Sequence, residues 1–147
     1  MAQEFEIIPH TADLKIRAYG NTFEELFRNA LKGMFSSIKP QGPRIHYKED
    51  MPEIHHFTAE HEVTVHSMNK ELLLIDFLSE CLYLSDVNNE AYFDTRFTLL
   101  NETELECTVY GVHITGFEEV EIKAVTYHDL EMQEIDSVWQ ATIVFDI

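Results

Sequence analysis

Apolar residues recur at helical spacing near the start of the chain. From Asn21 to Ile38 they fall three or four positions apart and form one stripe. Thr22 and Glu25 have the spacing of a capping box, which marks the beginning of a helix. The residues before this segment alternate between apolar and polar and end at Gly20. They predict a half-buried strand, so the first unit is a strand followed by a helix.

A second unit with the same order follows a proline-containing loop. Residues 61–67 alternate as a strand does, and Asn69 opens a helix that runs through Leu84 and is apolar on most sides. When the two helices are aligned on Asn69 and Asn21, their apolar positions coincide at several places. This is a weak internal repeat, which chance could also produce. If it is real, two strand-helix units lie side by side.

The remainder of the chain is strand-like. It is rich in Val, Ile, Thr and aromatic residues, and Asp136-Ser137 is suited to a hairpin turn. We expect an α+β fold in which two helices pack on one face of a mainly antiparallel sheet, with residues 1–147 as a single domain. The strands are expected over residues 93–100, 104–112, about 120–134 and 138–147.

Acidic residues are in large excess, and the excess is uneven. The 147 residues include 27 Asp and Glu against 10 Lys and Arg, a formal net charge of -17. Residues 1–50 hold seven of each sign, so the whole excess follows Met51, where the basic residues are only Lys70, Arg96 and Lys123. Such a stretch repels a phosphate backbone. We therefore expect no direct nucleic-acid binding and favour a basic protein partner or a metal cation; most of these carboxylates are expected to be solvated sheet surface.

The sequence carries few signs of export or of a membrane. No basic segment followed by an apolar one opens it, and its apolar runs are too short to cross a bilayer. Cys81 and Cys107 belong to no C-x-x-C pattern, and we expect both to be reduced residues of the core. A cytoplasmic protein without a membrane partner is the resulting expectation.

Catalytic signatures are missing from the sequence, which has no glycine-rich phosphate loop, no G-x-S-x-G and no H-E-x-x-H. Several histidines crowd into one region, but their spacing does not make their side chains converge as zinc ligands must. We interpret them as surface or loop residues. They are His46, His55, His56, His61 and His66.

Two other places carry groups suited to chemistry. His10 and Asp13 precede the first alternating strand, and Asp146 stands beside Ile147 at the end of an apolar strand. If that strand stays packed to its last residue, the α-carboxylate lies next to Asp146, and the two repel unless a cation or a lysine lies between them. Ca²⁺ and Mg²⁺ take oxygen ligands of this kind. A frayed acidic terminus is the alternative.

Three separated motifs resemble the archease family. The first is His10-Thr11-Ala12-Asp13 ahead of the strand and helix, and the second is the apolar helix with Asp76-Phe77-Leu78 and Cys81-Leu82-Tyr83-Leu84. The third is Ile122-Lys123-Ala124-Val125-Thr126-Tyr127-His128 with Trp139 and the closing Val144-Phe145-Asp146-Ile147. The resemblance spans nearly the whole chain, and only the loop from 40 to 56 is individual to it.

The resemblance implies a non-catalytic accessory protein. Archeases activate the RtcB-type tRNA-splicing ligase by promoting its GTP-dependent guanylylation and multiple turnover, and an earlier proposal makes them chaperones of tRNA-modifying enzymes such as a cytosine methyltransferase. Carried over by motif, the ligands of a divalent cation are Asp13, Asp146 and the main-chain carboxylate of Ile147. Ca²⁺ is the ion expected in a crystal, with Mg²⁺ and Mn²⁺ as alternatives.

Other residues of these motifs have two interpretations each. Lys123 either neighbours the acidic site, where it could contact a phosphate or a partner carboxylate, or is an ordinary exposed lysine. His10 and His128 either orient the carboxylates or are structural histidines. Asp76 is expected on an exposed helix face. A metal-dependent hydrolase is the remaining functional alternative, and its only candidate bases are the same two histidines.

Overall fold

Two helices and eleven strands make up the described part of the fold. The computed structural model describes residues 3–8, 13–118 and 120–147. Helix α1 spans Phe23–Ser37 and α2 spans Lys70–Asn88. The strands are β1 (Phe5–Ile8), β2 (Leu14–Gly20), β3 (Pro40–Gln41), β4 (His46–Lys48), β5 (Met51–Glu53), β6 (Ala59–His66), β7 (Glu90–Leu100), β8 (Glu104–His113), β9 (Gly116–Phe117), β10 (Ala124–Ile135) and β11 (Val138–Asp146).

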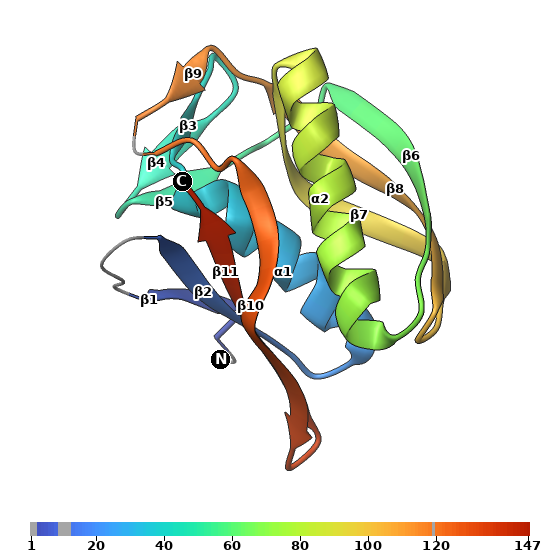
Figure 1. Cartoon of the computed structure of the whole chain (residues 1–147). Coiled ribbons are helices and arrows are strands. Elements are labelled where there is room, and N and C mark those ends of the chain that lie inside the picture. The colour runs from blue at the N-terminus through green and yellow to red at the C-terminus, as the bar shows by residue number, and fades with distance from the viewer. Residues whose placement is uncertain (1–2, 9–12, 119) are drawn as a thin grey trace.

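The strands pair antiparallel throughout and form two principal sheets. One sheet has the order β1-β2-β11-β10 and the other β6-β8-β7, while β3-β9 and β4-β5 are short two-stranded pairs. Helix α1 packs against β2 and β7, and α2 against β10 and β6, so both helices lie between the sheets (Figure 1). The α+β class is confirmed. The expectation of one sheet was wrong in detail, because its strands divide over two sheets that contact the helices from both sides.

The helix boundaries follow from side-chain caps. Thr22 Oγ1 accepts the N–H of Glu25 at 3.0 Å, and Asn69 Oδ1 accepts the N–H of Leu72 at 2.9 Å. Helix α2 runs four residues beyond the predicted Leu84 and is capped by Asn89 in the left-handed region. Its apolar residues cover most sides because sheets contact it on more than one side.

Two further sequence predictions are confirmed by the fold. Asp136 and Ser137 form the β10–β11 turn with φ values of 51° and 67°, as a two-residue hairpin turn requires. Cys81 and Cys107 are free and buried, and burial raises the pKa of the Cys107 thiol to about 11. Neither helix of the described residues combines the length and apolarity needed to cross a membrane.

Gly20 permits the closest approach between β2 and α1. A Cβ atom at Gly20 would lie 2.4 Å from the main-chain nitrogen of Leu26, whereas one at Gly116 would meet nothing within 4 Å. Because the clash is with main chain, we expect Gly20→Ala to lower the free energy of unfolding by about 2 kcal/mol or more in urea denaturation. Gly116→Ala is the matched control and should leave it within about 0.5 kcal/mol. Equal losses would contradict this account.

Candidate functional site

The pairing of β2 with β11 brings Asp13 and Asp146 together. In this ladder Phe145 lies opposite Leu14 and Val144 opposite Lys15. This pair ends the ladder, and Asp13 directly precedes Leu14 while Asp146 directly follows Phe145. Continued by one residue, the register would set the two aspartates opposite each other, where Cβ atoms are roughly 5 Å apart and point to the same face. Two carboxylates more than 130 positions apart in sequence are thus brought to the same end of one sheet.

Strand β10 flanks Asp146 on its other side. Ala124 pairs with Asp146, and the N–H of Lys123 donates to the Asp146 carbonyl oxygen at 2.7 Å. The main chain of Lys123 is therefore fixed beside Asp146, and its side chain is exposed. Ile147 follows directly and is 40% exposed.

Lys15 was missed by the sequence analysis. It stands two positions after Asp13 in the alternating β2 and pairs with Val144, two positions before Asp146. The period of a strand therefore places Lys15 on the same sheet face as both aspartates. The alternation of residues 14–20 could have revealed it, because Asp13 and Lys15 are separated by two positions. A cation on this face reduces the repulsion between the carboxylates.

The two histidines of the motifs have different outcomes. The prediction for His10 falls on residues 9–12, outside the described part of the chain. His128 is exposed and lies in the irregular stretch of β10 between Thr126 and Glu131, where its Nε2 is 3.3 Å from Asp129 Oδ2. It comes four residues after Ala124, about 13 Å along an extended strand. His128 thus contacts Asp129 at a point of β10 that is several residues away from Ala124, the partner of Asp146.

The donor atoms at the Asp13–Asp146 end are all oxygens. Nowhere in the described ranges do three or more His, Cys, Asp or Glu side chains gather as a metal site would need. The aspartates supply two carboxylates. A main-chain carboxylate at Ile147 would be the third ligand, and it is not a side chain. Oxygen donors of this charge suit a hard divalent cation rather than Zn²⁺ or Cu²⁺.

A groove begins beside these residues and runs between α2 and the first residues of β10. We call it the α2–β10 groove; its volume is about 460 Å³, and Lys123 and Ala124 line it. From α2 it is lined by Leu82, Tyr83 and Asp86. Tyr83 is 60% exposed, which is unusual in a helix otherwise contacted by two sheets. The groove thus joins exposed aromatic surface to the start of β10, where Ala124 pairs with Asp146.

Asp76 does not occupy an open helix face, and that prediction was wrong. Its carboxylate is only half-exposed and accepts a hydrogen bond of 2.6 Å from Ser67 Oγ. The pKa of Tyr127 in β10 is raised, mainly by burial and to a smaller extent by the nearby negative charge of Asp76. Asp76 therefore links the end of β6 to α2 and β10. Ser67 precedes α2 and Tyr127 belongs to the distant β10, so periodicity within α2 gave no signal of this role.

Replacing Asp76 should destabilise the protein. We expect Asp76→Asn to lower the free energy of unfolding by about 1–2 kcal/mol, because a charge-assisted hydrogen bond is weakened. Glu80→Gln, on the same helix at an exposed position without a hydrogen bond, is the control and should change it by less than about 0.5 kcal/mol. Chemical denaturation measures both variants. A loss in the control as large as in Asp76→Asn would contradict the assignment.

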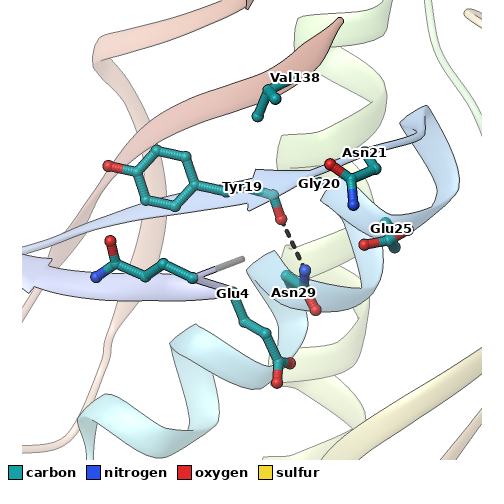
Figure 2. Close-up of a pocket in the computed structure, with 8 residues that line it drawn as sticks. Glu4, Tyr19, Gly20, Asn21, Glu25, Asn29 and Val138 are labelled. Carbon is teal, nitrogen blue, oxygen red and sulfur yellow. Dashed lines mark hydrogen bonds between the residues drawn. The ribbon is translucent and has the colours of Figure 1, made fainter. Parts of the chain in front are cut away.

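The small pocket of Figure 2 is structural. It holds about 150 Å³ between β2 and α1, and Tyr19, Gly20, Glu25 and Asn29 are among its lining residues. The amide Nδ2 of the buried Asn29 donates to the carbonyl oxygen of Tyr19 at 2.7 Å, drawn as a dashed line in Figure 2. This bond ties the helix to the strand. None of the residues predicted for the site lines the pocket.

The histidines that crowd between residues 46 and 66 form separate contacts. The rings of His46 and His55 are 5.9 Å apart, whereas His61 Nε2 is 2.7 Å from Glu90 Oε1. The same Glu90 oxygen accepts the hydroxyl of Tyr92 at 2.7 Å. His61 in β6 is therefore partly buried in a polar contact with Glu90, whereas we expected it to be a surface or loop residue.

Fold and site together define a class: a small α+β protein that holds two helices between antiparallel sheets, with Asp13 and Asp146 at one end of the β2–β11 pair. Residues 5–147 match the model of the Archease protein family (MTH1598/TM1083). The chain belongs to the archease family.

Relatives match along nearly the whole chain. The protein archease of Methanosarcina acetivorans is 37% identical over 99% of this chain and 97% of its own length, and that of Pyrococcus furiosus is 30% identical over 99% of both. Two solved structures are also similar. The solution structure of Methanobacterium thermoautotrophicum protein 1598 has a TM-score of 0.70 at 26% identity, covering 98% of this chain and 99% of the other. The crystal structure from Thermotoga maritima described as an archease, possible chaperone, has a TM-score of 0.61 at 26% identity, covering 95% and 94%.

Proposed function

We propose that this protein is an accessory activator of an RtcB-type tRNA-splicing ligase, in the cytoplasm, and that it acts through a divalent cation at the Asp13–Asp146 end. The observation that supports the proposal is the β2–β11 register, in which Leu14, the residue after Asp13, pairs with Phe145, the residue before Asp146. The ligase would be guanylylated faster and would turn over more often. The accessory protein itself would form no covalent intermediate.

The cation fits the residues that would hold it. Asp13 and Asp146 face the same side at neighbouring strand ends, and carboxylates this close favour a cation between them. The main-chain carboxylate of Ile147 would be the third ligand. Ca²⁺, Mg²⁺ or Mn²⁺ would accept this set and keep positions open for water or a partner's oxygen. When bound, the ion would supply positive charge that can hold a phosphate or a partner carboxylate.

The protein's own residues would position that ion. The hydrogen bond from Lys123 fixes the main chain of Asp146, and the register of β2 fixes Asp13. The two-residue period of β2 places Lys15 on the same sheet face as Asp13, where its charge would limit the repulsion before the cation arrives. The exposed Tyr83 of the adjacent α2–β10 groove gives a partner a surface to contact beside the ion.

Hydrolysis by the protein alone has weaker support. The thiols of Cys81 and Cys107 are buried with raised pKa values, so neither suits a nucleophile. His128 contacts Asp129 and is exposed, which gives it no oriented partner at the acidic pair. A phosphoester screen of the purified protein tests this alternative directly.

A chaperone or interaction module for tRNA-modifying enzymes is the second candidate function. The observation that favours it is the description of the Thermotoga maritima structure as a possible chaperone. Such a role needs contact surface but no cation. It predicts that activity toward a partner survives Asp13→Ala and Asp146→Ala.

Metal binding is the first test. Titration calorimetry with Ca²⁺ and with Mn²⁺ should give an affinity that falls at least about tenfold in Asp13→Asn and in Asp146→Asn, since each loses a charged ligand. Asp136→Asn, in the exposed β10–β11 turn, is the matched control and should bind as the wild type does. A form extended by residues after Ile147 should also bind more weakly. Unchanged affinity in the extended form would remove Ile147 from the ligand set.

Ligase activation is the second test. The protein is mixed with its cognate ligase, GTP and Mn²⁺, and the guanylylation rate and the number of turnovers are measured. We expect the wild type and Asp136→Asn to raise both, and Asp146→Asn to lose most of the effect. Failure of the wild type to raise either quantity would count against the proposal. Full activation by Asp146→Asn would transfer support to the chaperone role.

A further inference from the structure

A second open cleft lies on elements other than those of the acidic pair. It has a volume of about 780 Å³ and lies between α1 and β7, with β1 and the segment after β5 at its borders. We call it the α1–β7 cleft. This size matches the pockets that bind small organic ligands.

Basic side chains concentrate in this cleft. Arg28 and Lys32 from α1 and Arg96 from β7 line it, three of the ten basic residues of the chain, against the carboxylates of Glu4 and Asp94. In a protein of net charge -17 this is a local gathering of positive charge, even though Glu24 also lies 3.6 Å from Arg28. Beyond roughly 8 Å, salt at physiological concentration screens the acidic remainder, so the near charges govern a small ligand.

The three cations differ in what already binds them. Arg28 is held by Asp94 Oδ1 at 3.2 Å and donates through Nε and Nη2 to the carbonyl oxygen of Thr95. Lys32 forms an ion pair with Glu4 that is partly exposed, and an anion can replace such a partner at little cost. Arg96 is exposed and has neither a hydrogen bond nor an ion pair within the described ranges. Arg96 and Lys32 are therefore the cations available to a ligand.

The edge of β7 in the cleft is closed to an added strand. The N–H of Thr95 donates to Asp94 Oδ1 at 2.9 Å, while its carbonyl accepts from Arg28. Both main-chain groups that an extended peptide would use at this point are thus occupied. Recognition in the cleft must come from side chains, which favours a compact ligand over a β-strand.

Aromatic rings supply the other half of a recognition surface. Phe57 is 41% exposed, and its ring lies 6.1 Å from that of Tyr110 at an angle of 40°. Both rings line the same cleft as Arg96. Planar bases stack on exposed aromatic rings, and a neighbouring cation binds their phosphate.

We propose that the α1–β7 cleft binds a nucleotide, with the phosphate at Arg96 and Lys32 and the base against Phe57 and Tyr110. The site is independent of the proposed ligase activation, because it shares no residue with the acidic pair or the α2–β10 groove. It is a local exception to the expectation that an acidic surface excludes phosphates. The same chemistry could be offered by a free nucleotide or by the end of a single-stranded RNA.

The test is titration calorimetry of the full chain with four separate ligands: adenosine 5′-monophosphate, adenosine, inorganic phosphate and penta-adenylate RNA. We expect the monophosphate to bind more tightly than adenosine. Arg96→Gln should weaken it about tenfold or more, because a charged hydrogen-bond donor is lost. Phe57→Ala should weaken the monophosphate about fivefold or more and leave inorganic phosphate unchanged. Arg44→Gln, an exposed arginine outside the cleft that forms no ion pair with the described residues, is the matched control and should bind normally.

The outcomes separate the sources and the alternatives. Equal affinity for the monophosphate and the RNA supports a free nucleotide, and tighter RNA binding supports a single-stranded end. No binding of either at millimolar concentration overturns the proposal, as does unchanged binding in Arg96→Gln. An equal loss in Arg44→Gln also overturns it, because the effect would then reflect net charge alone. Binding of a glutamate-rich peptide in place of both nucleotides would assign the cleft to a protein partner instead.

Discussion

The antiparallel pairing of β2 with β11 is the interaction on which both the fold and the acidic pair depend. Ile16 and Ala18 on β2 and Ile143 and Phe145 on β11 are completely buried on the face toward α1. Each of the isoleucine and phenylalanine side chains contributes about 1.5–3 kcal/mol through its removal from water, and the methyl group of Ala18 contributes less. A slip of one residue would turn these side chains to the opposite face, so the core fixes the register. The same register brings Asp146 to the end of the ladder at which Asp13 precedes β2.

Local patterns predicted the elements well because their causes are local. The caps at Thr22 and Asn69, the alternation before Gly20 and the turn at Asp136 all depend on residues within a few positions. The division into two sheets depends on contacts between distant strands, which periodicity does not encode. The short strands β3, β4, β5 and β9 hold two or three residues each, too few for an alternating pattern to identify.

The candidate site was predictable only in part for similar reasons. Asp13 and Asp146 came from the motifs, and the strand register then brings both to the end of the β2–β11 ladder. His128 follows a break in β10, and a bulge cannot be placed from alternation alone. Asp76 has a carboxylate that interrupts an apolar helix, and its donor on Ser67 lies across the turn into α2. A charged residue in an apolar run signalled that a partner was needed, but not which one.

Charge is separated over the surface of this protein in a way that net charge conceals. The acidic pair uses carboxylates from both ends of the chain, whereas the α1–β7 cleft collects Arg28 and Lys32 from the neutral first third and Arg96 from the acidic remainder. Only folding brings Arg96 to the other two, so a count along the sequence assigns it to a region that repels anions. Asp94 and Glu24 limit the positive charge of the cleft by pairing with Arg28. The proposed cation site and the proposed anion site are compatible in one small fold, because they lie on different strands and screening keeps their fields local.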